Sequence, residues 1–344
     1  LIVTSCKTSN SENLSDDVSA RVENLDFIFG TDSLAEITIS ISRTEWNHLL
    51  KFYDWEEKNE NYVHADFEMK KTSSSGVEKK WQKDDVGFRL RGNTSRIRPQ
   101  TGYGKGNNDY VQSHFKIDFE EFLQDGESWK LDNCMKGIML KRFKDDPTFC
   151  REVFCYNLFR KNGVWTAPRA GYAHLVIKIA DSADDVETVD YGIYAMIEQI
   201  DKQFLKARKY ARNDGDFSSP NGNLWKCTWQ KFGADLTNSD SSAFGIEVSK
   251  IVGAEFNDSD IESSSYTGFD EKKYTYDLKT NKENLDSAKK EFINFINELN
   301  SLNTGNETEL KNFFSSKMDV ELFLKTYAIN VLCGMWDDYW NGNN

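Results

Sequence analysis

The sequence lacks several features that define common classes of protein. It has no run of about eighteen apolar residues, the minimum for a membrane-spanning helix, and so it predicts no such helix. It also lacks a basic excess, because 43 Lys and Arg stand against 56 Asp and Glu, giving a net charge of -13. An acidic surface repels nucleic acid and anionic lipid headgroups, and we therefore expect no nucleic-acid partner.

The cysteines form neither a disulfide framework nor a familiar metal motif. No Cys-x-x-Cys or His-x-x-x-His pair occurs, so a structural zinc site is not expected. Cys150 and Cys155 fall five residues apart on one expected helix. The other scattered cysteines are Cys134, Cys227 and Cys333. We interpret all five as small buried apolar side chains.

The sixth cysteine, Cys6, has a different setting. A short apolar stretch ending in small residues precedes it, and a polar segment rich in Ser, Asn and Asp follows. This arrangement resembles the cleavage site of a bacterial lipoprotein signal that has lost most of its apolar core and its Met. We expect residues 1–24 to be a signal remnant and flexible tether, and acylated Cys6 to be the only membrane attachment of an extracytoplasmic protein of the bacterial cell envelope or surface. The alternative is a chance cysteine in a frayed terminus.

Much of what is present points to a packed α+β chain. Its 344 residues, 38% hydrophobic and 13% aromatic, are enough for two domains or for one domain of two lobes. Apolar and polar residues alternate at 35–41 and 114–119, which predicts half-buried strands. Helical spacing prevails later, at 284–302 and 320–334. We predict one globular domain over 25–344, rich in strands first and in helices last.

Three other segments complete the prediction of secondary structure. A helix is expected at 146–161, with Asp145 or Asp146 as its cap, and another at 198–208. Residues 235–270 are rich in Ser, Asp and Gly, and we expect them to be irregular.

A loop rich in arginine and hydroxyl groups is the first candidate for ligand binding. Residues 88–96 run from a strand into this loop. Gly92 permits close approach of the backbone to a ligand, and free N–H groups with the Ser95 hydroxyl suit phosphate. The loop region also supplies guanidinium donors: Arg89, Arg91, Arg96 and Arg98. The alternative is a solvated hairpin with surface arginines.

The second candidate is Lys116, in the alternating strand 114–119. If Phe115, Ile117 and Phe119 face the core, Lys116 points the other way, with His114 and Asp118. In a cleft, a strand lysine of this kind can bind phosphate, as it does in protein kinases. The alternative is a lysine on the solvent-exposed face of a strand, without a ligand.

The third candidate is Glu198, which follows the apolar strand 191–197. An acid in this place could pair with Lys116 or help to hold a metal. The alternative for Glu198, and for Asp201, is a favourable position at the start of a helix.

The fourth candidate is the acidic and amide-rich segment 336–344. Asp337 or Asp338 could accept a hydroxyl proton, and a following Asn could bind Mg²⁺ through its carbonyl oxygen. The spacing from Asp338 to Asn343 equals that of the protein-kinase catalytic loop. Taken alone the pattern is weak, because Asp and Asn are common in turns.

Taken together, in this order, these stretches resemble the CotH family, which is named for a spore-coat protein kinase. The similarity covers about residues 30–344, and it is carried by seven segments: 91–95, 115–119, 151–168, 192–205, 222–226, 276–280 and 336–344. The resemblance implies a divergent, two-lobed protein-kinase-like fold. It further implies an ATP- and Mg²⁺-dependent enzyme that phosphorylates Ser or Thr of a protein.

The resemblance also implies roles for single residues. Arg91 and Ser95 would contact phosphate, Lys116 would bind the α- and β-phosphates, and Glu198 would pair with Lys116 or the metal. The remaining roles belong to segment 336–344: Asp337 as catalytic aspartate with Asp338 as the substitute, and Asn343 or Asn344 as metal ligand.

In one respect the sequence departs from the family. Members continue past the Asn-rich segment to a second metal-binding aspartate, whereas this sequence stops at Asn344. We expect a truncated sequence, and a gene ending at Asn344 would refute this.

Two other functions remain open on the sequence. One is a catalytically inactive, lipid-anchored surface protein that binds a partner or glycan. The other is a glycoside hydrolase that uses Glu198 and Asp337 as paired carboxylates.

Overall fold

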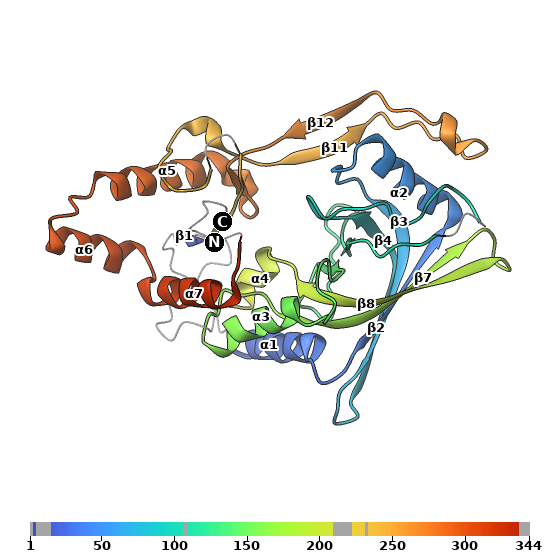
Figure 1. Cartoon of the computed structure of the whole chain (residues 1–344), viewed down its shortest axis with the longest axis horizontal. Coiled ribbons are helices and arrows are strands. Elements are labelled where there is room, and N and C mark those ends of the chain that lie inside the picture. Colours follow the sequence, from blue (N-terminus) through green and yellow to red (C-terminus); the bar gives the residue numbers. More distant parts are fainter. Residues whose placement is uncertain (1–2, 5–14, 106–108, 209–221, 231–232, 337–344) are drawn as a thin grey trace.

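A closed barrel of seven strands forms the first part of the chain (Figure 1). The computed structural model describes residues 3–4, 15–105, 109–208, 222–230 and 233–336. The strands follow one another around the barrel in the order β2 (Ala35–Ser42), β3 (Val63–Thr72), β4 (Glu78–Leu90), β5 (Phe115–Asp118), β6 (Gly137–Lys141), β8 (Val186–Glu198) and β7 (Ala170–Ala180). Neighbouring strands are antiparallel except β2 and β7, which run parallel and close the barrel.

The alternation of apolar and polar residues along the strands explains how the barrel core forms. Because side chains alternate across a strand, apolar residues at every second position all face inward. In β2, Ile37 and Ile39 are at most 1% exposed, while the residues between them face outward. Phe88 of β4 and Phe115 of β5 stack inside with ring centroids 5.0 Å apart. The expected strand positions at 35–41 and 114–119 are therefore confirmed.

Four helices accompany the barrel: α1 (Ser15–Phe29) and α2 (Arg43–Trp55) pack against its core, α3 (Arg151–Lys161) contacts β7, and the short α4 (Lys202–Lys206) packs with Leu224 of the second part. The α2 helix begins after Ser42, whose hydroxyl accepts a hydrogen bond from the Glu45 N–H at 3.1 Å. It buries Trp46 and Leu50 against the barrel core. Helix α1 begins at Ser15, inside the segment expected to be a flexible tether, and it buries Leu25 and Ile28.

The second part of the chain combines a small sheet with three helices. The sheet has the order β1 (Val3–Thr4), β9 (Asn223–Cys227), β13 (Tyr276–Leu278) and β10 (Phe244–Gly245), and the helices are α5 (Leu285–Ser301), α6 (Glu307–Lys317) and α7 (Val320–Cys333). Phe292 of α5 packs against Tyr276 at 4.9 Å and against Trp225 at 5.6 Å between ring centroids. An aromatic core separate from that of the barrel thus holds this part together.

A hairpin connects the two parts over the top of the molecule in Figure 1. It consists of β11 (Val248–Val252) and β12 (Gly268–Lys272). In the connection between these strands, the Phe256 ring stacks on His48 of α2 at 3.6 Å and lies 5.3 Å from Trp55. The expectation of an irregular 235–270 is wrong, because this segment includes paired strands and packs on the barrel.

Three short 3-10 helices lie at Ser241–Ala243, Ile261–Ser263 and Lys282–Asn284. The mixed helical and strand composition agrees with the prediction, and the helices at 284–302 and 320–334 are confirmed by α5 and α7. Within the described ranges, every helix is too short or too polar to cross a membrane.

Two predicted helices begin later than expected. The expected helix 146–161 starts only at Arg151, after a turn in which Phe149 has a φ of +54°. The residue that precedes it is Cys150, which makes no side-chain cap hydrogen bond, so the predicted cap is wrong; Asp146 accepts the Arg151 N–H at 2.8 Å from further back in the turn. The expected helix 198–208 shrinks to α4, because Asp201 caps it by accepting the N–H groups of Gln203 and Phe204. Glu198 therefore belongs to the end of β8.

Candidate functional site

Lys116 lies on the outer face of the barrel, in the middle of β5. It stands opposite Arg89 of β4 and Met139 of β6, whereas Phe115 and Ile117 are fully buried inside. Its ammonium lies 3.5 Å from an Asp118 carboxylate oxygen. The expected orientation of Lys116, away from the core and with Asp118, is confirmed.

Arg89 and Glu60 extend this outer face. An Arg89 Nη2 atom lies 3.2 Å from a Glu60 carboxylate oxygen. Tyr62 lies beneath both cations, with Arg89 at 5.1 Å and Lys116 at 5.5 Å from its ring centroid. Arg89 is 7% exposed, and its buried Nε has no hydrogen-bond partner among the described residues. A buried guanidinium N–H without a partner is unusual, because nearly all buried polar groups are hydrogen-bonded.

The charge of Lys279, which follows β13 in the second part of the chain, also acts on the Glu60 carboxylate. Desolvation raises the pKa of Glu60, but the charges of Arg89, Lys279 and Lys116 outweigh it and hold that pKa below the usual value. The side chain of Glu60 is nevertheless 52% exposed, so solvent reaches the group. We refer to Glu60, Arg89, Lys116 and Lys279 as the open cluster.

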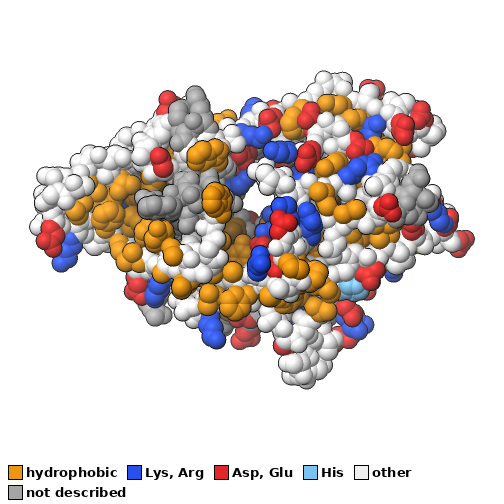
Figure 2. Space-filling view, viewed as in Figure 1, with side chains coloured by type: hydrophobic (Ala, Val, Ile, Leu, Met, Phe, Trp, Pro, Cys, Tyr) orange, Lys and Arg blue, Asp and Glu red, His pale blue; other side chains and the backbone are white. Residues whose placement is uncertain are grey.

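The open cluster lies where the two parts of the chain face each other. Figure 2 shows a hollow near the middle of the molecule with lysine and arginine side chains along its border. Lys279 also pairs with Asp277, and a Glu247 oxygen lies 3.9 Å from its ammonium. Burial raises the pKa of Glu247, and the neighbouring Asp277 raises it further. The sequence analysis gave no role to Glu60, Glu247 or Lys279, although 276–280 was among the family segments.

The loop after β4 is built around Gly92. Its φ of +110° favours glycine, and a Cβ there would lie 3.1 Å from the Ser95 hydroxyl and 3.2 Å from His114 Cδ2. Arg91 is half-buried, and both burial and the charge of Arg89 lower its pKa. The structure thus brings Arg91, Gly92 and Ser95 together at one end of β4, close to Arg89.

Two of the predicted phosphate donors are occupied by other groups. Arg96 donates to the carbonyl oxygens of Glu57 at 3.0 Å and Gly92 at 3.2 Å, so it fixes the loop. Arg98 donates to both carboxylate oxygens of Asp54, at 2.8 and 3.0 Å. Their roles are structural, and the prediction that they bind phosphate is corrected.

His114 is a residue whose importance the sequence analysis missed. It is 2% exposed, and its Nδ1 accepts the backbone N–H of Arg142 at 2.9 Å. Burial, together with the charge of Arg91 and its neighbours, lowers the pKa of His114 to about 3. The imidazole is therefore neutral, and it supports the Gly92 turn from below. The alternation of residues 114–119 gave no sign of this role, because it predicted that the His114 side chain faces outward and it does not show that the loop at Gly92 covers it.

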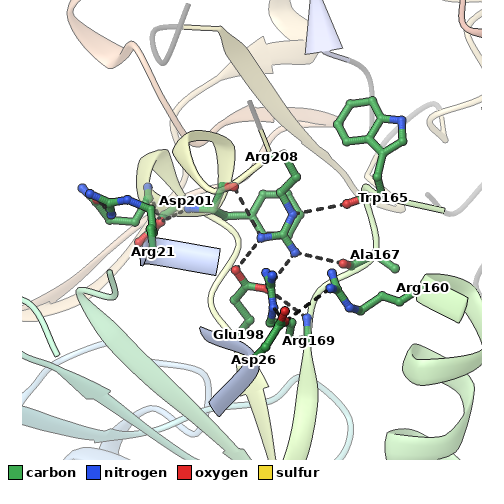
Figure 3. Close-up of polar contacts among 11 residues, drawn as sticks. Arg21, Asp26, Arg160, Trp165, Ala167, Arg169, Glu198, Asp201 and Arg208 are labelled. Atoms are coloured by element: carbon green, nitrogen blue, oxygen red, sulfur yellow. Dashed lines mark hydrogen bonds and ion pairs between the residues drawn. The ribbon is translucent and has the colours of Figure 1, made fainter. Parts of the chain in front are cut away.

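Glu198 belongs to a second group of charges (Figure 3), in which Glu198, Arg169 and Arg208 are buried and Asp26 lies at the surface. Its two carboxylate oxygens accept from Arg208, one of them at 2.7 Å, and from the Arg169 backbone N–H at 2.9 Å. Arg169 also donates to Asp26 of α1 at 2.6 Å. We refer to Glu198, Arg208, Arg169 and Asp26 as the closed cluster.

The predicted pairing of Glu198 with Lys116 is corrected by the strand register. Glu198 stands opposite Ile138, and Ile138 stands opposite Ile117, so all three lie on the inner face. Lys116 lies on the outer face and one row away. Desolvation raises the pKa of Glu198, but Arg208 and Arg169 outweigh it and lower that pKa overall. A buried, ionised Glu198 also does not suit the general acid that the hydrolase alternative requires.

The remaining predicted site residues lie outside the described residues: Cys6, Asp337, Asp338, Asn343 and Asn344. Among the described residues, no group of three or more His, Cys, Asp and Glu side chains could hold a metal ion.

Comparison with known proteins gives one match. A family model described as CotH kinase protein matches residues 88–344, which include Arg89, Lys116, Glu198 and Lys279. No curated protein and no solved structure matches the chain.

Proposed function

Because the chain belongs to the CotH kinase protein family, a membership that suggests a kinase-like function, we propose that it is an ATP- and Mg²⁺-dependent protein kinase. It transfers the γ-phosphoryl group to a Ser or Thr hydroxyl of an extracytoplasmic protein. The barrel and the helical part serve as the two lobes of a divergent kinase-like fold, with the nucleotide between them. A lipid on Cys6 anchors the enzyme at the bacterial cell envelope or surface, and its partner is the protein substrate and not nucleic acid.

The observation that carries this proposal is the open cluster. Basic groups from both parts of the chain converge on one half-exposed carboxylate, and Arg89 keeps a buried N–H without a partner among the described residues. Phosphoryl transfer depends on positioning and on neutralising phosphate charge, so cations held at a solvent-accessible gap are the chemistry that it needs. The residues present fit the phosphates of ATP.

Individual residues have distinct parts in this proposal. Lys116 and Arg89 bind the α- and β-phosphates, and Arg91 with the Gly92–Ser95 turn binds a further phosphate oxygen. Glu198 acts indirectly, because it holds Arg208 and Arg169 behind the barrel wall. Asp337, or Asp338 in its place, accepts the proton of the attacking hydroxyl.

Magnesium is assigned to the segment after α7. Oxygen ligands suit Mg²⁺, and the sequence offers them at Asn343 or Asn344 together with the aspartates. When bound, Mg²⁺ neutralises charge on the phosphates.

The binding step is tested by calorimetry with Mg²⁺-ATP on the full-length protein and its Lys116→Ala variant. We expect the substitution to weaken binding at least tenfold, which is about 1.4 kcal/mol. Lys178→Ala is the matched control, because Lys178 is an exposed lysine on the outer face of β7 in the same barrel. Equal affinity of the wild type and the Lys116→Ala variant would remove Lys116 from the site.

Transfer is tested separately with radiolabelled ATP and a Ser- and Thr-containing acceptor protein. We expect incorporation to fall at least a hundredfold in Asp337→Asn or in Asp338→Asn, with ATP affinity largely kept. If neither variant changes incorporation, the assignment of the catalytic aspartate is wrong.

A second candidate is a catalytically inactive surface protein on the same fold. The observation that favours it is that, among the described residues, the ion pair of Lys116 is with Asp118, whereas active protein kinases require a lysine–glutamate ion pair. ATP binding without phosphoryl transfer, or no ATP binding by the wild type, would support this candidate.

A further inference from the structure

Helices α3 and α7 pack side by side in opposite directions. A Cβ at Gly163, just after α3, would lie 3.8 Å from the Lys325 ammonium in the first half of α7. One turn back along α3, Phe159 packs in the same buried cluster as Ile329, which is one turn further along α7. Side chains four residues apart lie on the same face of a helix, so the next pair in this series is Cys155 and Cys333.

The helix packing places these two thiols opposite each other. Both side chains are partly buried. Cys333 also packs with Phe159 and Ile329, so the contact between the helices holds it in place. Burial and the Cys333 thiol raise the pKa of Cys155 to about 11.

The other described cysteines lack such a partner. Cys134 is buried and its thiol contacts the Leu131 carbonyl oxygen at 3.2 Å, while Cys150 is exposed and contacts the Thr148 hydroxyl at 3.0 Å. Cys150 and Cys155 were predicted to lie on one helix. Residues five apart on a helix point in different directions, so these two thiols would not meet there. The packing of α3 on α7 pairs Cys155 with Cys333.

We propose that Cys155 and Cys333 are an oxidation site, at which they form a disulfide that joins α3 to α7. The oxidant is another disulfide, on a small molecule or on a thiol–disulfide exchange protein. One of the two thiols, as thiolate, attacks that disulfide and expels one thiol. The second cysteine then attacks the mixed disulfide and expels the other, so two cysteine thiols are oxidised and one external disulfide is reduced to two thiols.

The bond would fix the last turn of α7, which ends where Gly334 adopts a φ of +60°. It would also close a loop between residues 155 and 333, and long loops lose much entropy on cross-linking. If the proposed kinase function holds, the bond restrains the chain a few residues before Asp337. The disulfide itself does not depend on that function.

The first experiment maps the bond chemically. The full-length protein is incubated with oxidised glutathione, free thiols are blocked with N-ethylmaleimide, and the protein is digested with trypsin without reduction. We expect a linked species of peptide 152–160, which carries Cys155, and the tryptic peptide that begins at Thr326, which carries Cys333, and its loss after dithiothreitol. Alkylation of both cysteines after oxidation, or a bond from Cys155 to Cys150, would overturn the proposal.

The second experiment uses variants and needs no kinase assay. Oxidised wild type should melt about 5 °C above reduced wild type. This difference should disappear in Cys155→Ser and in Cys333→Ser, and persist in Cys150→Ser, which alters an exposed cysteine beside the same helix. Persistence of the shift in both Cys155→Ser and Cys333→Ser would refute the bond, even if ATP binding and transfer are as proposed.

Discussion

The open and closed clusters both combine a glutamate with arginine, but they differ in how far the glutamate is exposed to solvent. In each, a glutamate at the barrel meets arginine, and each glutamate has a lowered pKa because neighbouring cations outweigh its desolvation. The Glu198 side chain is 3% exposed and both of its oxygens are bonded, whereas the Glu60 side chain is 52% exposed. Beside Glu60, Arg89 also retains an unbonded N–H within the described structure.

The difference teaches how to separate a structural ion pair from a candidate binding site. In the closed cluster the cations have their bonding capacity met by Glu198, by Asp26 and by carbonyl oxygens such as that of Ala167. Within the described residues, no buried side-chain atom of these four residues lacks a hydrogen-bond partner. In the open cluster three cations act on one half-exposed carboxylate, so a ligand with phosphates can complete it.

The largest expected effect separates the two clusters by stability. Glu198→Gln leaves Arg208 and Arg169 buried without their counter-charge, and we expect a loss of about 3–5 kcal/mol in the free energy of unfolding. Glu60→Gln, the matched change in the open cluster, should cost less than about 1 kcal/mol because its group is half-exposed. Urea unfolding of both variants checks this, and equal losses would break the comparison.

Lowering the pH should reduce the free energy of unfolding through His114, the neutral imidazole at the border of the open cluster. The unfolded chain protonates His114 near pH 6.5, but the folded protein does so only near pH 3. The unfolded state therefore binds more protons in this window, and stability is full above it and falls as the pH drops through it. We expect this group to contribute a loss of about 2 kcal/mol between pH 7 and pH 5.

His114→Asn should remove that contribution, because Asn keeps an acceptor for the Arg142 N–H and does not titrate. His48, whose pKa is raised by Glu45 and Asp258 despite its burial, acts in the opposite direction and is unchanged in both proteins. Unfolding free energies at pH 7, 6 and 5 measure the difference. Parallel pH profiles of wild type and variant would show that His114 is not the group responsible.

Gly92→Ala tests the turn that borders the open cluster. The positive φ and the crowding against Ser95 should together cost about 1–3 kcal/mol and weaken ATP binding. Gly76→Ala is the control, because Gly76 has a φ of +85° but no atom within 4 Å of an added Cβ. A Gly76→Ala variant as destabilised as Gly92→Ala would mean that the backbone alone, and not the packed turn, sets the cost.

The smallest expected effect concerns the ring beneath the open cluster. Tyr62→Leu removes the cation–π contacts with Arg89 and Lys116, and should weaken ATP binding by about 0.5–1 kcal/mol. Tyr62→Phe keeps the ring and should bind as the wild type does. Calorimetry on the two variants shows whether the ring or the hydroxyl of Tyr62 supports ATP binding. A loss of affinity in Tyr62→Phe would point to the hydroxyl.

A large share of the local structure could be predicted from the sequence. The alternation at 35–41 and 114–119 placed two barrel strands, because these features depend on near neighbours. Arg91, Gly92, Ser95 and Lys116 were found as candidates for the same reason. The start of α3 was missed because the turn at Phe149 overrides the helical spacing before it.

The candidate site as a whole could be predicted only in part. The alternation of apolar and polar residues shows which side chains share a face of one strand. It does not show which other strand lies beside that strand. The partner of Glu198 was therefore assigned wrongly, and Lys279, far along the chain, was not connected with Lys116. The placement of Cys155 opposite Cys333 was missed for the same reason.

By itself, then, the sequence determined the barrel strands, the amphipathic helices, the glycine turn and the family resemblance, all of which depend on short-range periodicity and on residue type. The tertiary structure decided that β2 and β7 close a barrel, that Glu198 is enclosed by Arg208 and Arg169, and that the charge of Lys279 acts on Glu60. These outcomes depend on contacts between distant segments. Their energies arise only when the packed chain excludes water from some charges and leaves others at its surface.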